Sequence, residues 1–234
     1  MSKAFRVSRH LTLENGTVIL LRRSTRARRM TLCVSRGDGQ VALTIPTRAP
    51  LSEARAFAEL KADWLTRTIA KMPGKKIVAE GAQVPVEGRS LTITPFPLRA
   101  ARIEGDLLLV PQARPAGAVV QGFIKHLAHD RLRMACDRHA ANLGRPFTAL
   151  VLRDTRSRWG SCTSDARLMF SWRLAMAPPE VLDYVAAHEV AHLAHMDHSP
   201  QFWAAVERLL PDFAVRRGWL RQHGNALLAW RFRD

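Results

Sequence analysis

The sequence has few cysteines, and the three it has form no recognisable pattern. Cys33, Cys136 and Cys162 are odd in number and widely separated, and no Cys-x-x-Cys pair occurs. Such spacing indicates neither a disulfide framework nor a zinc site with cysteine ligands. Unpaired cysteines are typical of proteins in a reducing compartment, so we expect a cytoplasmic protein.

Long hydrophobic runs are also missing. No stretch approaches the roughly 18 apolar residues that a membrane span requires. Charges at Arg6, Arg9 and Glu14 interrupt the N-terminal segment where a signal peptide needs its apolar part. We therefore expect no membrane partner. Apolar residues still make up 47% of the chain, which is enough for a substantial core and argues against a disordered protein.

Acidic residues are scarce relative to basic ones. The chain of 234 residues has 20 Asp and Glu against 36 Lys and Arg, which gives a net charge of +16. This excess attracts polyanions such as nucleic acids and nucleotide phosphates. Most of it is arginine spread along the whole chain, a distribution that genomic base composition can also produce. The one dense cluster lies between Arg22 and Arg29 and is the candidate contact surface for a nucleic acid.

The first half of the chain shows strand patterns and one helical pattern. Asn15-Gly16 lies between two apolar runs and predicts a β-hairpin, and Gly37-Asp38-Gly39 predicts a second one. A period of 3.6 residues from Leu51 to Met72 predicts one helix, which Pro73-Gly74 ends. Further short strands are expected over residues 83–86, 91–94 and 107–110.

The second half is predominantly helical. One long amphipathic helix is predicted over residues 116–143, with Gly144 at its end. Later helices are expected to begin at Pro178-Pro179 and after Ser199, and a last one to end near His223, before Gly224. Two strands are expected over residues 150–153 and 168–172, the second as a candidate edge strand.

These patterns predict an α+β protein with two regions. Residues 1–112 form a β-rich N-terminal region with one helix. Residues 113–234 form a mainly helical catalytic region with a small sheet. The sequence contains no internal repeat, and it does not indicate an oligomeric state.

The segment His188-Glu189-Val190-Ala191-His192 predicts a metal site. Residues four apart on a helix lie on one face, so the imidazoles of His188 and His192 can point at a common ion. Glu189 lies to the side of that axis, where its carboxylate can reach a metal-bound water. The helix is otherwise apolar, and metal binding explains why it carries these polar side chains. We expect one zinc ion.

Zinc needs a third protein ligand if one tetrahedral position is to stay open for water. His198 is the favoured candidate, although a straight helix would carry it about 15 Å from His188. The chain must therefore turn back, and Ser199-Pro200 is typical of a new helix beginning there. His195 is the alternative ligand. The spacing matches the long metzincin motif, except that His195 stands in place of its glycine.

The segment Arg158-Trp159-Gly160-Ser161-Cys162 contains candidate substrate-binding residues. Arg158 can bind a phosphate, a peptide carboxylate or a developing oxyanion. Gly160 allows a tight turn, and Ser161 can donate a hydrogen bond to backbone. Two roles are about equally compatible with Trp159. It can contact the substrate, or it can lie beside a turn that closes a pair of strands.

Together these segments resemble the YgjP-like family of predicted zinc metallopeptidases, which are related to the SprT-like and WLM proteases. The most specific matches are Arg158 to Cys162, Phe170-Ser171-Trp172-Arg173-Leu174, Ala177-Pro178-Pro179 and the stretch from His188 to Trp203. Asp197 departs from the asparagine of the family pattern.

The resemblance implies a zincin-like α+β core, zinc ligation by His188, His192 and His198, and catalysis by Glu189. Arg173, within the matched segments, becomes a further candidate for substrate binding.

The expected activity is metal-dependent hydrolysis, in the first place of peptide bonds in a peptide or protein substrate. Glu189 would take a proton from a water bound to Zn²⁺ and pass it to the leaving amine. One alternative is a nucleoside triphosphate pyrophosphatase that uses the same site, although no Gly-rich phosphate loop is evident. A second alternative is a nucleic-acid-associated protease whose basic surface binds DNA.

Overall fold

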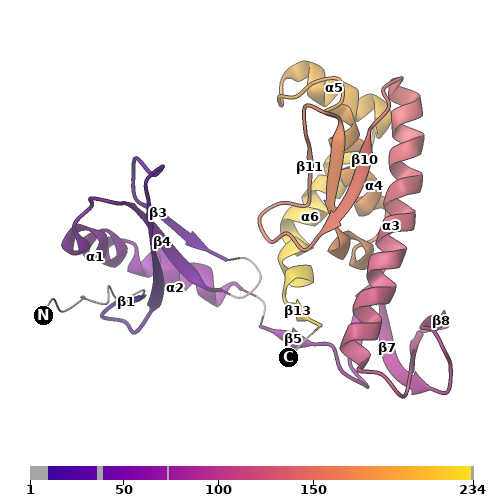
Figure 1. Cartoon of the computed structure of the whole chain (residues 1–234), viewed down its shortest axis with the longest axis horizontal. Helices are drawn as coiled ribbons and strands as arrows, with labels where there is room; N and C mark the ends of the chain where they lie inside the picture. The colour runs from indigo at the N-terminus through magenta and orange to yellow at the C-terminus, as the bar shows by residue number, and fades with distance from the viewer. Residues whose placement is uncertain (1–9, 36–38, 73, 233–234) are drawn as a thin grey trace, which may run out of the picture. The chain divides into compact units, whose positions relative to one another are not determined.

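The computed structural model describes residues 10–35, 39–72 and 74–232 and divides the chain into two compact units, Met1–Gly74 and Lys75–Asp234 (Figure 1). We call them unit 1 and unit 2. The secondary structure is a mixture of helices and small sheets, which confirms the predicted α+β class. The division falls after Gly74 and not at residue 112 as expected. The reason is that the strands over 83–111 share one hydrophobic core with the helices that follow them.

Unit 1 contains a four-stranded sheet in the order β1-β2-β4-β3. Strands β1 (His10–Thr12) and β2 (Val18–Ser24) pair antiparallel, which confirms the hairpin at Asn15-Gly16. Strands β3 (Thr31–Val34) and β4 (Val41–Pro46) also pair antiparallel, as the second predicted hairpin requires. Its turn residues Gly37 and Asp38 lie outside the described residues. Strands β2 and β4 run parallel in the middle of the sheet.

Two short helices complete the core of unit 1, where one was predicted. Helix α1 (Leu51–Leu60) and helix α2 (Ala62–Ala70) are separated by Lys61, whose backbone angles of −102° and 6° leave the helical region. Buried residues of both helices pack against the alternate, inward-facing residues of the sheet, among them Leu43 and Ile45. Pro73, expected to end the helical segment, lies outside the described residues.

Unit 2 begins with small sheets that lie against a long helix. Strand β5 (Lys76–Ile77) pairs with β13 (Trp230–Arg231) near the end of the chain. A four-stranded sheet then forms in the order β6-β7-β9-β8 and contains the strands predicted here. Its bounds are β6 (Gln83–Val86), β7 (Arg89–Phe96), β8 (Arg102–Glu104) and β9 (Leu107–Pro111). Helix α3 (Ala116–Leu143) follows and ends, as predicted, at a left-handed Gly144 with φ of +70°.

A three-stranded sheet in the order β10-β12-β11 covers the region of the predicted metal site. Strand β10 (Ala149–Arg153) and strand β12 (Arg167–Ser171) were expected, but β12 is the central strand and not an edge. The edge strand is β11 (Gly160–Cys162), which pairs antiparallel with β12 in a segment where a turn was expected at Gly160. The last three residues of the segment Arg158 to Cys162 therefore form a sheet edge.

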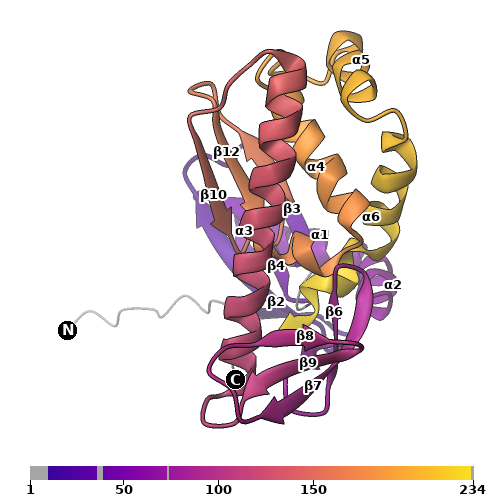
Figure 2. The ribbon, with the colours of Figure 1, turned by 90° about the vertical axis from the view of Figure 1, so that its right-hand side faces the viewer.

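The remaining helices enclose the motif helix. A short 3-10 helix η1 (Trp172–Met176) leads into α4 (Pro179–Ala191), followed by α5 (Pro200–Leu209) and α6 (Phe213–Leu228). Helix α4 packs against α3, α5, α6 and strand β11, and Figure 2 shows it between α3 and α6. Helix α6 continues through Gly224, although it was expected to end before it. Within the described residues, none of the helices is both long and apolar enough to cross a membrane.

Candidate metal centre

The end of α4 explains how His198 returns to the motif helix. Helix α4 ends at Ala191, and turns follow through Ala194, with the His195 amide donating to the Ala191 carbonyl at 3.1 Å. The Ser199 hydroxyl then caps α5 by accepting a hydrogen bond from the Phe202 amide at 3.4 Å. The chain thus reverses direction between two helices, and this reversal carries His198 back beside His188.

Three imidazoles meet at this reversal. One ring nitrogen from each of His188, His192 and His198 lies within 4.8 Å of the others, and this group of donors could hold a metal ion. The Nε2 atoms of His188 and His198 are 3.3 Å apart. Two nitrogens bound to one tetrahedral zinc at about 2.05 Å are about 3.4 Å apart, so the spacing fits such an ion.

The buried environment keeps His188 and His192 in the neutral form that a metal requires. Burial, together with the neighbouring His192, His198 and Arg217, lowers the pKa of His188 to about 3. Burial also lowers the pKa of His192. Both rings therefore present a lone pair at neutral pH.

His195 contributes through its backbone and not through its ring. The His192 Nδ1 lies 2.9 Å from the His195 carbonyl oxygen, a distance that suits an Nδ1–H donor. With Nδ1 protonated, the lone pair of His192 is on Nε2, and the ring orientation is fixed by the same hydrogen bond. The side chain of His195 is not part of the three-histidine group.

A buried aromatic ring lies against all three histidines. The ring centroid of Phe202 is 4.9 Å from that of His188, 4.4 Å from that of His192 and 4.8 Å from that of His198. Its side chain has no exposed surface, and it stacks on His192 at an interplanar angle of 27°. Trp203 lies a little further from His188 and His198.

Glu189 lies under the edge strand. Its side chain is buried, and a Cβ atom added at Gly160 would come within 2.5 Å of its Oε1. Burial raises the pKa of Glu189 to about 8, against the opposing charge of Arg158. A carboxylate with a pKa in this range accepts and returns a proton near neutral pH. Gly160 is therefore needed for close approach, and the expected turn is not its role.

A cavity of about 300 Å³ opens between α4 and β11. It brings together the predicted residues Arg158 and Ser161 with Glu189 and the three histidines. The exposed side chain of Met196 also faces it, which the sequence did not indicate. The lining residues are Arg158, Gly160, Ser161, Cys162, His188, Glu189, His192, Met196 and His198.

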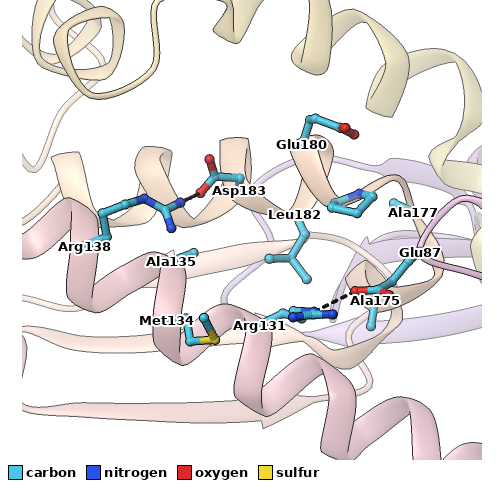
Figure 3. Close-up of a pocket in the computed structure, with 11 residues that line it drawn as sticks. Glu87, Arg131, Met134, Ala135, Arg138, Ala175, Ala177, Glu180, Leu182 and Asp183 are labelled. Atoms are coloured by element: carbon cyan, nitrogen blue, oxygen red, sulfur yellow. Dashed lines mark hydrogen bonds and ion pairs between the residues drawn. The ribbon is translucent and has the colours of Figure 1, made fainter. Parts of the chain in front are cut away.

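A larger cavity of about 420 Å³ lies elsewhere in unit 2, between α3, α4 and the loop joining β6 to β7 (Figure 3). Its arginines are already paired: Arg131 contacts Glu87 at 2.6 Å and Arg138 contacts Asp183 at 2.5 Å. None of the metal-site histidines lines it. The candidate chemistry therefore belongs to the smaller cavity.

Two predicted substrate residues do not line the cavity. Arg173 is 4% exposed and donates to Asp154 at 2.7 Å and to the carbonyls of Leu227 and Trp230 at 3.0 and 3.1 Å. It therefore has a buried structural role that ties the end of the chain to the sheet. Trp159 packs on α6, where a Cβ atom at Gly224 would meet its ring at 2.9 Å.

Comparison with known proteins identifies the family of this chain. The model of the family described as YgjP-like, metallopeptidase domain, matches residues 28–223. Among solved structures, the metallopeptidase zymogen abylysin of Pyrococcus abyssi is similar over 42% of this chain and 92% of its own, at 22% identity and a TM-score of 0.34. A search of curated proteins gives no match. Since the family model covers most of the sequence, this chain belongs to the YgjP-like family and carries its metallopeptidase domain.

Proposed function

We propose that the protein is a zinc-dependent peptidase that acts in the cavity between α4 and β11. The observation that supports this most strongly is the convergence of three imidazole nitrogens within 4.8 Å, next to a buried carboxylate. His188, His192 and His198 would hold the ion. A set of three imidazole nitrogen donors suits zinc and leaves one tetrahedral position open.

When bound, the ion supplies a Lewis acid that polarises a carbonyl and lowers the pKa of water. Glu189 acts as general base and then as general acid, since its pKa near 8 suits transfer in both directions. Gly160 lets the Glu189 carboxylate approach the edge strand closely. Arg158 lines the cavity with an exposed side chain and can bind an oxyanion or a carboxylate of the substrate.

The position of strand β11 at the edge of its sheet favours a peptide as the substrate. Within the described part of the chain it pairs with β12 alone, so its other side offers backbone donors and acceptors. An extended peptide can add to such an edge as a further strand. Ser161, in the middle of β11, lines the same cavity. An edge strand next to the candidate ligands therefore favours an extended polypeptide.

Hydrolysis of a nucleoside triphosphate at the same site is the second candidate, and the presence of Arg158 is what favours it. A triphosphate needs several cations or a Gly-rich loop around its phosphates. Arg158 is the single arginine among the residues that line the cavity. We therefore prefer the peptide substrate.

The test incubates zinc-loaded protein with a panel of denatured proteins and, separately, with nucleoside triphosphates. We expect cleavage of denatured protein, and we expect Glu189→Gln to lower its rate by at least about a hundredfold, the usual contribution of a general base. Zinc content is measured in both proteins as the control. Undiminished hydrolysis by zinc-loaded E189Q would show that Glu189 does not have this role, and turnover of nucleotides alone would contradict the peptidase.

A further inference from the structure

The excess positive charge is concentrated in unit 1. Residues 1–74 contain fourteen Lys and Arg against five Asp and Glu, a net charge of +9 out of +16 in less than a third of the chain. The candidate metal centre lies wholly in unit 2. The chemistry of that centre therefore does not account for the charge of unit 1.

The strand order brings the arginines of two loops to one end of the sheet. Strands β2 and β3 are not neighbours, because β4 lies between them. Ser24 at the end of β2 pairs with Pro46, and Thr31 at the start of β3 pairs with Thr44. The connection over residues 25–30 must therefore pass the end of β4, where the loop over 47–50 leaves the sheet.

Five arginines lie at this end, and we call them the arginine cluster. Its members are Arg22, Arg26, Arg28, Arg29 and Arg48, and all are exposed. A sixth arginine, Arg23 in β2, ties the loop over 47–50 to this strand, because its Nη1 donates to the carbonyls of Thr47 at 2.6 Å and Ala49 at 3.0 Å. These hydrogen bonds fix the loop that carries Arg48 beside the end of β2.

Acidic residues are nearly absent from this end of unit 1. Between Glu14 and Glu53 the sequence contains one acid, Asp38, which lies outside the described residues. Glu53, in the first turn of α1, is the one acid close to the cluster in sequence. Across the described residues, no ion pair forms between a carboxylate and a guanidinium of the cluster.

The composition of this surface favours a phosphate backbone as its ligand. Each guanidinium presents a planar fork of donors that matches a phosphate, and the cluster contains no lysine. Residues 6–56 include no Phe, Trp or Tyr, so the stacking platform typical of single-strand binders is missing. A set of arginines without aromatic residues suits sequence-independent contact with a duplex.

We propose that the arginine cluster of unit 1 binds the phosphate backbone of duplex nucleic acid without sequence preference. This binding site is separate from the proposed peptidase and does not need the metal. Binding would raise the local concentration of the protein on nucleic acid, where unit 2 would act on polypeptides that are also bound there.

The test measures binding of the full-length protein to a labelled 20-base-pair DNA duplex by fluorescence anisotropy between 50 and 200 mM salt. Five phosphate contacts predict a slope of log affinity against log salt of about −4.5, and so a fall of about 10²–10³ over this range. We expect the combined variant R22Q/R26Q/R28Q/R29Q/R48Q to bring the slope close to zero. Arg23 is left intact to preserve the loop over 47–50.

The matched control removes five exposed arginines of unit 2, as R99Q/R114Q/R145Q/R153Q/R208Q, with the same change in net charge. The slope of log affinity against log salt for this control should stay close to that of the wild type. The double variant R28Q/R29Q replaces the combined cluster variant if that variant does not fold. The magnitude of its slope should be smaller than that of the wild type by about 2. Metal-free wild type should bind as the loaded protein does, which separates this result from the peptidase test.

Three results would overturn the proposal. The first is equal loss of affinity in the cluster variant and the control, which would mean that overall charge is responsible. The second is tighter binding to single-stranded DNA than to the duplex. The third is binding to vesicles of anionic lipid with no binding to the duplex.

Discussion

The backbone of Gly160 lies so close to the Glu189 side chain that a Cβ atom at position 160 would come within 2.5 Å of Oε1 and 2.6 Å of Cγ. Gly160 belongs to the edge strand and Glu189 to the motif helix, so this contact sets the distance between the two elements. A side chain at position 160 must push the carboxylate or the strand away. The absence of a side chain at Gly160 is therefore part of the candidate site.

Gly160→Ala is expected to lower peptidase activity by about a hundredfold or more, because the displaced Glu189 loses its alignment for proton transfer. Zinc content should be unchanged, since the three histidines are not touched. Ser161→Ala is the control on the same strand and should retain folding and metal binding. Full activity in G160A would show that the position of Glu189 does not matter.

The sequence contains enough information to predict most of the elements and the three histidines that the structure brings together, because both depend on short spacings. Asn15-Gly16 marks a turn locally, and the pair His188 and His192 lies on one helical face by periodicity alone. The need for a chain reversal before Ser199 follows from helix length. These features were visible without any tertiary contact.

Other features depend on partners far away in sequence and were predicted incorrectly or not at all. Arg173 was expected to contact substrate, but its hydrogen-bond partners lie 19, 54 and 57 residues away. The edge position of β11 depends on which strand pairs with β12, and no local pattern records that choice. The unit boundary at Gly74 likewise depends on which core the strands over 83–111 join.

Replacement of each candidate third ligand distinguishes His198 from His195. His198→Ala should weaken zinc affinity by more than the 10–100-fold typical of residues that only support a ligand. His195→Ala should change it little, because the hydrogen bond to His192 uses the backbone carbonyl that remains. Competition with a chromophoric chelator measures both. Greater loss in H195A than in H198A would reverse the assignment.

Phe202→Leu tests whether the buried ring positions the histidines. We expect zinc affinity to fall about 10–100-fold, as for other groups that orient ligands, and the visible spectrum of the cobalt-substituted protein to change. Phe232→Leu is the matched control, because Phe232 is also buried but contacts Trp172 and not the histidines. Equal affinity loss in the two variants would mean that general core packing explains the effect.

Arg173→Met tests the buried role that the structure gives to Arg173. The change leaves two carbonyls and Asp154 without their donor, so the free energy of unfolding should fall by about 3 kcal/mol. Chemical denaturation measures this loss. KM should stay close to that of the wild type in the folded variant. A raised KM with an unchanged free energy of unfolding would instead indicate that Arg173 binds substrate.

Stepwise return of zinc to metal-free protein tests the three-histidine centre most directly. The rate of cleavage of a denatured protein is followed as Zn²⁺ is added to protein stripped by a chelator. We expect no cleavage at the start, a linear rise and a plateau at one ion per chain. Full cleavage by the stripped protein, or no cleavage after one equivalent of zinc has bound, would contradict a zinc-dependent peptidase at His188, His192 and His198.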